Sequence, residues 1–120
     1  MLERAVRRVL IGDFGVIARM GLRRLLDDEG VDVLKAAGTR PGIIPRLSEI
    51  QPDVVLLDLD ADGVPDLAAR ICSLFPSMTV IACSSAEPIM RVFPPFHHGE
   101  SYIVPFTRLQ FAAAVKDCVS

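Results

Sequence analysis

The chain of 120 residues has few cysteines and no long apolar segment, and each absence argues against a class of protein. Its three cysteines, Cys72, Cys83 and Cys118, lie far apart and form no CxxC pair. We therefore expect these cysteines to be small buried residues of a protein in a reducing compartment, and not to form a disulfide, redox or metal site. No window reaches the roughly 20 apolar residues of a membrane span, and the N-terminus lacks the apolar core of a signal peptide. These observations predict a cytoplasmic protein without a membrane segment.

The sequence also lacks a strong excess of either charge. A net charge of −2 is too small to indicate a nucleic-acid or membrane surface. Hydrophobic residues make up 51% and charged residues 23%, which predicts a globular protein with an ample core. The length suffices for one domain and not for two. We therefore predict a single domain over residues 1–120, with a core from about residue 7 to residue 118.

Apolar runs alternate with amphipathic stretches along the chain. Strands are predicted at 8–13, 31–37, 54–58, 79–83 and 102–104. Helices are predicted at 15–28, 40–51, 65–75 and 107–118, with an irregular fourth helix at 86–92 that Pro94 and Pro95 cut off. Five βα units predict a doubly wound α/β fold with right-handed crossovers. At this length we expect a flavodoxin-like three-layer sandwich with a parallel sheet in strand order 2-1-3-4-5.

The first and last predicted helices have clear apolar faces. In the first, the expected inward positions are Ile17, Met20, Leu22, Leu25 and Leu26. In the last, Thr107 is the expected N-cap. Its expected inward positions are Leu109, Phe111, Ala112 and Val115, and whether Cys118 also faces inward is left open.

The strand at 54–58 carries the strongest functional signal. Its apolar residues, Val54 to Leu57, run directly into Asp58. An unbroken apolar run suits a strand that is covered on both faces. In open α/β sheets, ligands and chemistry collect at the carboxyl ends of the strands. Asp58 is therefore the predicted reactive group.

Several motifs point to one family. They are Val9-Leu10-Ile11-Gly12-Asp13, Gly21-Leu22-Arg23-Arg24-Leu25-Leu26, Gln51-Pro52-Asp53-Val54-Val55-Leu56-Leu57-Asp58-Leu59, Val80-Ile81-Ala82-Cys83-Ser84-Ser85 and Tyr102-Ile103-Val104-Pro105-Phe106. With these motifs, the chain resembles the receiver domains of bacterial two-component response regulators, the CheY-like family, over nearly its whole length. The resemblance implies a phosphorelay signalling protein that is not an enzyme.

The resemblance also implies a role for each matching residue. In that family the carboxylate that ends the third strand accepts a phosphoryl group from a histidine kinase, and Asp58 matches it. Because aspartate is a weak nucleophile toward an anionic phosphoryl group, Mg²⁺ must offset charge there. Asp13 matches the first acid of the metal-binding pair, and Asp60 matches a position whose backbone carbonyl is a metal ligand. Ser84 matches the hydroxyl that bonds the phosphoryl group and carries the switch.

The chain departs from the family at two charged positions. Phe14 stands where the second acid, the principal metal ligand, is expected. Where the family has a lysine before Pro-Phe, either Val104 replaces it or the lysine is deleted. The aromatic switch position falls on Tyr102 with a gap and on Ser101 without one. Since loss of a charge partner costs orders of magnitude in phosphoryl-transfer rate, we infer a degenerate receiver, or pseudo-receiver, with a weakened Mg²⁺ site.

The alternative function is a working phosphoacceptor, phosphorylated at Asp58 with Mg²⁺ by a histidine kinase and controlling an output such as transcription. Asp60 and Asp62 could add charge for the metal, or they could be solvent-facing loop acids. The spacing of these three acids matches half of a calcium loop, but Ala69 replaces its bidentate acid.

Two further chemistries fit less well. Asp58-Leu59-Asp60 resembles the nucleophile motif of haloacid-dehalogenase-type phosphatases, which need a downstream lysine, and none lies between Lys35 and Lys116. The adjacent His97 and His98 lack the nearby ligands that zinc requires.

A surface hypothesis rests on the segment after the fourth strand. Val92, Phe93 and Phe96 could pack inward, or they could present an apolar contact patch. Receivers commonly dimerise or contact partners through the face formed by helix four, strand five and helix five. The expected partners are a histidine kinase or other signalling protein, a second copy of the chain, and an effector domain, such as a DNA-binding domain, outside this sequence.

Overall fold

A single six-stranded sheet runs through the molecule, in the order β2-β1-β3-β4-β5-β6. The structure is a computed structural model that describes residues 7–12, 14–34, 40–96 and 100–116. The strands are β1 (Arg8–Ile11), β2 (Asp32–Leu34), β3 (Val54–Asp58), β4 (Thr79–Cys83), β5 (Ile89–Phe93) and β6 (Tyr102–Pro105). The first four are parallel, β5 runs antiparallel to β4, and β6 runs antiparallel to β5.

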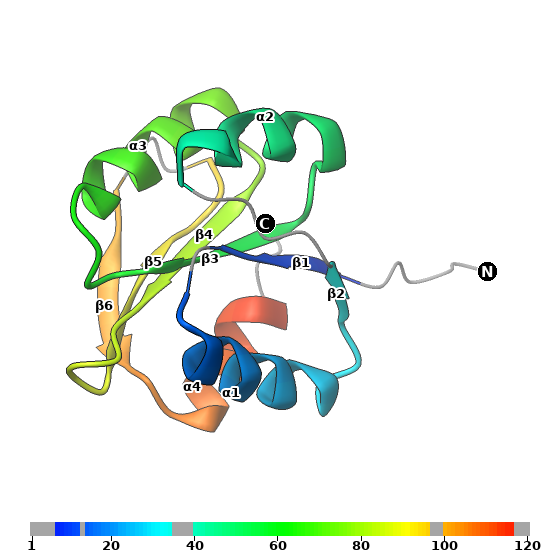
Figure 1. The fold of residues 1–120 in the computed structure, drawn as a ribbon, viewed down its shortest axis with the longest axis vertical. Coiled ribbons are helices and arrows are strands. Elements are labelled where there is room, and N and C mark those ends of the chain that lie inside the picture. Colours follow the sequence, from blue (N-terminus) through cyan, green and yellow to red (C-terminus); the bar gives the residue numbers. More distant parts are fainter. Residues whose placement is uncertain (1–6, 13, 35–39, 97–99, 117–120) are drawn as a thin grey trace.

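Two helices cover each face of the sheet (Figure 1). The helices α1 (Val16–Asp27) and α4 (Arg108–Lys116) lie on one face, and α2 (Arg40–Ile50) and α3 (Val64–Leu74) lie on the other. The doubly wound α/β fold is therefore confirmed, including the order 2-1-3-4 of the parallel strands. None of the described helices has the length and apolar character needed to cross a membrane.

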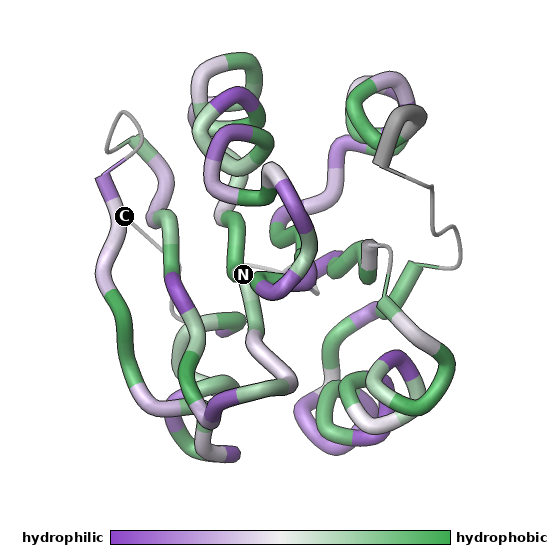
Figure 2. Tube along the Cα trace, turned by 60° about the vertical axis from the view of Figure 1, so that its left-hand side comes forward, coloured by the Kyte–Doolittle hydropathy of each residue, from purple (hydrophilic) through white to green (hydrophobic). Residues whose placement is uncertain are grey.

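The apolar run of β3 is buried on both faces, as its sequence predicts. Val54 and Leu56 belong to the core under α1 and α4, whereas Val55 and Leu57 belong to the core under α2 and α3. This division follows from the period of two, which sends successive side chains of a strand to opposite faces. The hydrophobic residues of the strands consequently lie between the two helix layers (Figure 2).

The predicted fourth helix at 86–92 is wrong, because the segment forms the antiparallel strand β5. Between Pro88 and Pro94 only a segment of little more than one helical turn would remain, at about 3.6 residues per turn. As a strand, the same residues bond to β4, in a register that places Cys83 opposite Met90. The sheet thus has six strands where five were predicted. It is mixed and not wholly parallel, and β6, the predicted fifth strand, pairs antiparallel with β5 instead of lying beside β4.

The strand β5 also corrects part of the predicted surface patch. Val92 and Phe93 are only 2% and 4% exposed, because they point into opposite cores. Their side chains therefore cannot contribute to an exposed contact surface in this fold. Phe96, by contrast, is 60% exposed, and its backbone N–H donates to the Pro76 carbonyl oxygen at 2.8 Å.

Helix α1 buries a narrower face than predicted. Leu22 and Leu26 are buried, and Ala18 and Leu25 pack beside them. At about 100° per residue these positions share one arc of the helix, and Ile17 and Met20 fall outside it. Both are largely exposed, so their predicted inward orientation is wrong.

Helix α4 begins as predicted and is tied to α1. The Thr107 hydroxyl oxygen accepts a hydrogen bond from the Gln110 backbone N–H at 3.1 Å, which confirms the N-cap. Phe111 and Val115 are buried, whereas Leu109 is exposed, contrary to prediction. Cys118 lies outside the described residues. Ion pairs join the two helices between Asp28 and Arg108 and between Glu29 and Lys116.

Candidate functional site

Asp58 ends β3 at the carboxyl edge of the sheet, where the sequence places it. Its half-buried carboxylate accepts a hydrogen bond from the Asp60 backbone N–H, with 3.0 Å between the nitrogen and Oδ1. The β3–β4 register sets Asp58 opposite Cys83, and the Leu59 N–H donates to the Cys83 carbonyl oxygen at 2.9 Å. Asp58 is therefore held between its own loop and the end of β4.

Asp60 forms a polar network with the loop that follows β4. Its Oδ1 accepts a hydrogen bond from the Ser84 hydroxyl at 2.9 Å. Its Oδ2 accepts from the Ser85 N–H at 2.8 Å, the Ser85 hydroxyl at 3.2 Å and the Ala86 N–H at 3.1 Å. The Ser85 N–H, followed by the Ser84 hydroxyl, holds the pKa of Asp60 below its ordinary value, because these donors favour the carboxylate.

Ser84 is fully engaged in the same network. Its hydroxyl oxygen accepts hydrogen bonds from the Ala86 N–H at 3.1 Å and the Glu87 N–H at 3.0 Å, while its proton goes to Asp60. The side chain is buried. Within the described part of the chain, the hydroxyl thus meets the carboxylate of Asp60, although the sequence comparison with receivers suggests a role toward Asp58.

Phe14 lies across from this network, on the side of α1. Only 8% of the residue is exposed, and its ring packs with the core under α1 and α4. The chain reaches it through Gly12, whose N–H donates to the Leu56 carbonyl oxygen at 2.8 Å. A Cβ at Gly12 would lie 2.7 Å from that oxygen, so only glycine lets the chain pass this close to β3.

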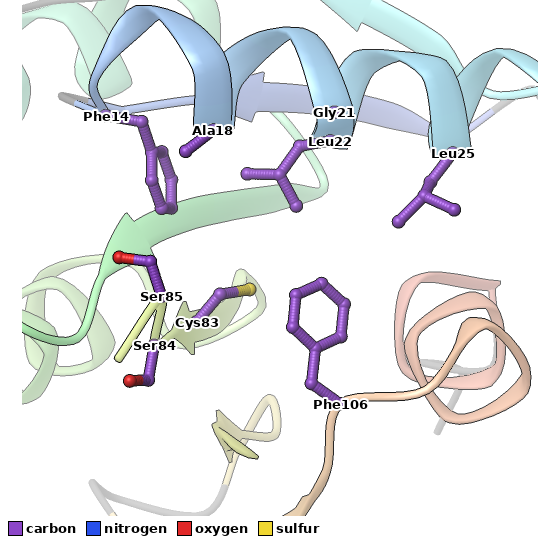
Figure 3. A pocket seen from close by; sticks show the side chains of 9 residues that line it. All are labelled: Phe14, Ala18, Gly21, Leu22, Leu25, Cys83, Ser84, Ser85 and Phe106. Atoms are coloured by element: carbon purple, nitrogen blue, oxygen red, sulfur yellow. The ribbon is translucent and has the colours of Figure 1, made fainter. Parts of the chain in front are cut away.

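A pocket of about 270 Å³ opens between α1 and the end of β4 (Figure 3). It is lined by Phe14, Ala18, Gly21, Leu22, Leu25, Cys83, Ser84, Ser85 and Phe106. Burial, followed by the nearby charge of Asp58, raises the pKa of the Cys83 thiol to about 12, so the thiol is protonated at neutral pH. The lining side chains are therefore uncharged, and the hydroxyl oxygens of Ser84 and Ser85 point away from Leu22 and Phe106 (Figure 3).

Two features of the described residues argue against a strong magnesium site. Both carboxylate oxygens of Asp60 accept hydrogen bonds, so its side chain is not free to add charge for a cation. Phe14 places an apolar ring where the principal metal ligand was expected. In the described ranges, no group of three His, Cys, Asp or Glu side chains comes together. Asp13, His97 and His98 lie outside those ranges, so magnesium binding stays a prediction.

Known proteins similar to the chain are response regulators. No protein-family model matches it. It is 31% identical to the response regulator GacA of Pseudomonas viridiflava over 83 residues, which are 67% of this chain and 39% of that protein. It is 28% identical to the chemotaxis protein CheY of Thermotoga maritima over 82 residues, 66% of this chain and 68% of CheY.

A solved structure of a response regulator from Thermotoga maritima shares the fold, with a TM-score of 0.59, 20% identity and 68% of each chain covered. These similarities support a CheY-like receiver domain. The match spans only 39% of the length of GacA. We therefore do not assign the output functions of such longer regulators to this chain.

An apolar residue of strand β6 stands where the family lysine was expected. Val104 pairs with Met90 and packs against the core under α1 and α4. Tyr102, the candidate switch aromatic, is half exposed beside Val92, and its role stays a prediction. Ser101, the other candidate, accepts a hydrogen bond from the Arg91 guanidinium at 3.0 Å.

The sequence analysis did not predict two features of the site, the Asp60 network and the pocket. The Asp60 network joins residues 24 to 26 positions apart, and its signal was an acid two residues beyond β3 followed by a Ser-Ser pair at the end of β4. The pocket had no signal beyond Phe14, because its walls come from α1, β4 and the segment before α4. Asp62, the second extra acid, is exposed.

Proposed function

We propose that this receiver is a pseudo-receiver, which acts in two-component signalling through protein contacts while phosphorylation of Asp58 is weakened or lost. The observation that carries the proposal is the buried ring of Phe14 in the apolar core, at the position of the expected second acid. A hydrated cation and an aromatic ring cannot share that volume. We also propose that residues 1–120 form a single receiver domain and that the protein is cytoplasmic.

The physical argument concerns charge at the acceptor. Transfer of a phosphoryl group to a carboxylate brings anions together, and enzymes of this kind rely on preorganised cations to offset them. Val104 packs against the core three strands from Asp58, because Asp58 pairs with Cys83, Cys83 with Met90 and Met90 with Val104. At about 4.8 Å between neighbouring strands, even a lysine at this position would lie too far from Asp58 to reach a phosphoryl group. The Ser84 hydroxyl is bonded to Asp60, which would have to release it before it could bind a phosphoryl group at Asp58.

A working phosphoacceptor remains the second candidate, and one observation favours it. Asp58 is only half buried and keeps the position at the end of β3. In that case a histidine kinase would phosphorylate Asp58, and an effector domain outside this sequence would respond.

The test is phosphorylation by acetyl phosphate, followed by intact mass. We expect the wild-type chain to keep its mass with and without Mg²⁺. The variant Phe14→Asp restores the acid, and we expect it to gain one phosphoryl group in a Mg²⁺-dependent manner, faster than the wild-type chain by orders of magnitude. Circular dichroism checks that Phe14→Asp is folded.

The matched control is Asp58→Asn, which cannot accept a phosphoryl group in either background. Stoichiometric, Mg²⁺-dependent modification of the wild-type chain that disappears in Asp58→Asn would overturn the pseudo-receiver proposal and establish the second candidate.

The proposed partners are a histidine kinase or other signalling protein and a second copy of the chain. For the homodimer, we propose that Phe96 contributes exposed apolar area. It lies beside the turn that follows α3, where its N–H bonds to Pro76. The edge strand β6 adds the half-exposed Tyr102 and Ile103.

A further inference from the structure

The two edges of the sheet differ in how well they are protected against pairing with another strand. At one edge, β2 has three residues and begins with the exposed, charged Asp32. At the other edge, β6 has four residues, and none of them is charged. Charges and short length blunt an edge strand, whereas an uncharged edge strand can pair with a further strand. The open edge of the sheet is therefore β6, at its margin in Figure 1.

The residues of β5 alternate between the two strands beside it. The Ser84 N–H donates to the Ile89 carbonyl oxygen at 3.1 Å, so the backbone of Ile89 faces β4. The Phe106 N–H donates to the Pro88 carbonyl oxygen at 2.8 Å, so the backbone of Pro88 faces β6. Because bonded and non-bonded pairs alternate along an antiparallel ladder, Met90 faces β6 as Pro88 does.

This alternation decides which backbone groups of β6 face outward. Val104 pairs with Met90, so its N–H and C=O point to β5. The backbone groups of Ser101, Ile103 and Pro105 have the opposite phase and point away from β5. No strand of the described ranges lies beyond β6 to receive them. Since proline has no N–H, the outward donors are the N–H groups of Ser101 and Ile103.

A second copy of the chain matches these outward groups when it runs antiparallel about Ile103. Each Ile103 N–H then donates to the Ile103 carbonyl oxygen of the other copy. Ser101 falls opposite Pro105, so the Ser101 N–H meets the Pro105 carbonyl oxygen of the other copy. If Ile103 paired with Pro105 instead, each Ile103 carbonyl oxygen would face a residue without an N–H. Pro105 therefore favours the register that is centred on Ile103.

The side chains favour the same register. It sets Tyr102 opposite Val104 of the other copy, an aromatic and β-branched pair of the kind that stabilises sheets. On the opposite face of the sheet the two Ile103 side chains meet. Tyr102 and Ile103 are 49% and 51% exposed in the single chain, so pairing would bury apolar area. A register centred on Tyr102 would instead set the charged Glu100 opposite Val104.

We propose that two copies of the chain pair antiparallel through β6, so that one sheet runs through both. This inference rests on the homodimer proposed above and gives it a surface and a geometry. The two-fold interface uses β6 of both copies, and the edges that remain are the β2 strands with Asp32. The assembly therefore closes at the dimer. The pairing does not depend on whether Asp58 is phosphorylated.

The deciding experiment is amide hydrogen exchange, followed by NMR in the full chain at low and at high protein concentration. The outward Ile103 amide should exchange at least about tenfold more slowly at the concentration where dimers dominate. The amides of Tyr102 and Val104 bond to β5 within one chain, so they should be protected at both concentrations. This alternation separates strand pairing from a dimer that is held by side chains alone.

A charge at the two-fold axis tests the same pairing. Ile103→Lys sets two ammonium groups beside each other, and sedimentation equilibrium should show dimerisation at least about tenfold weaker. Ile17→Lys is the matched control, because Ile17 is an apolar residue of α1 that is 85% exposed. It should leave dimerisation unchanged. Circular dichroism checks that both variants are folded, and if Ile103→Lys is not, the exchange of the wild-type amides decides.

Three results would overturn the inference, and each has a different meaning. A chain that stays monomeric at high concentration overturns it together with the proposed homodimer, and leaves the β6 edge to a strand of another protein. A dimer with an unprotected Ile103 amide, weakened by Phe96→Asp but not by Ile103→Lys, overturns the pairing and leaves the homodimer standing. Assemblies larger than a dimer contradict the closed two-fold geometry. The loss of phosphorylation at Asp58 is judged separately, by intact mass.

Discussion

The two sides of the β3 terminus are built from opposite chemistry. On the side of the β4–β5 loop, the carboxylate of Asp60 accepts four hydrogen bonds from three residues. On the side of α1, the ring of Phe14 is held by apolar packing and borders a pocket. A phosphoryl site needs charge compensation on both sides of the acceptor. Here the hydrogen bonds on one side offset the charge of Asp60 itself, and Phe14 brings no charge on the other side. The proposed loss of phosphorylation at Asp58 rests on this contrast.

The largest effect should come from breaking the apolar side. Phe14→Ala removes a buried ring, and we expect it to lower the free energy of unfolding by about 3 kcal/mol, toward the low end for such changes because the pocket already borders the ring. Urea denaturation measures the change. Phe96→Ala, at an exposed ring, is the control and should cost within about 0.5 kcal/mol. Equal losses in both variants would contradict the packing of Phe14.

A second change tests the backbone contact on which both sides depend. The added Cβ of Gly12→Ala would lie 2.7 Å from the Leu56 carbonyl oxygen, so β1 must move from β3. We expect a loss of about 2 kcal/mol in urea denaturation. Gly21→Ala is the control, because its Cβ meets nothing within 4 Å on helix α1, and it should stabilise the chain by up to about 1 kcal/mol. A neutral Gly12→Ala would show that this approach of the two strands is not required.

The polar side should respond to pH. Because the pKa of Asp60 is lowered in the folded chain, its network contributes stability above the ordinary value of 3.8, and this contribution is lost as pH falls through the folded pKa. Asp60→Asn should therefore exchange the Ser85 and Ala86 amides about tenfold faster than the wild type near neutral pH. That difference should shrink below pH 3.8. Hydrogen exchange followed by NMR measures it, and a difference that is constant with pH would contradict the network.

The smallest effect concerns the exposed phenylalanine. Phe96 has a positive φ of 63°, a conformation that Asp adopts more readily than Phe, so Phe96→Asp should fold normally. If Phe96 joins a dimer, light scattering should show concentration-dependent association that this variant weakens about tenfold. A wild-type chain that stays monomeric at high concentration would remove the dimer proposal.

The sequence predicted the parallel half of the fold because its signals are local. The apolar run into Asp58 and the N-cap at Thr107 are each read from a few adjacent residues, and both are confirmed. The helix predicted at 86–92 was wrong, because this segment becomes a strand by pairing with β4 and a local sequence pattern does not show that pairing. The predicted inward orientation of Ile17 and Met20 was wrong, because the sequence shows that a helical residue is apolar but not which residues lie beside it in the fold.

For the candidate site, the sequence by itself determined which residues end the strands: Asp58 after β3 and Ser84 after β4. It also determined that an apolar ring, Phe14, replaces an expected acid. Only the tertiary structure decided that Ser84 bonds to Asp60, and that Phe14 and Phe106 enclose a pocket. The physical reason is that hydrogen bonds and cavities form between segments far apart in the chain, where the fold sets distances that sequence spacing does not contain.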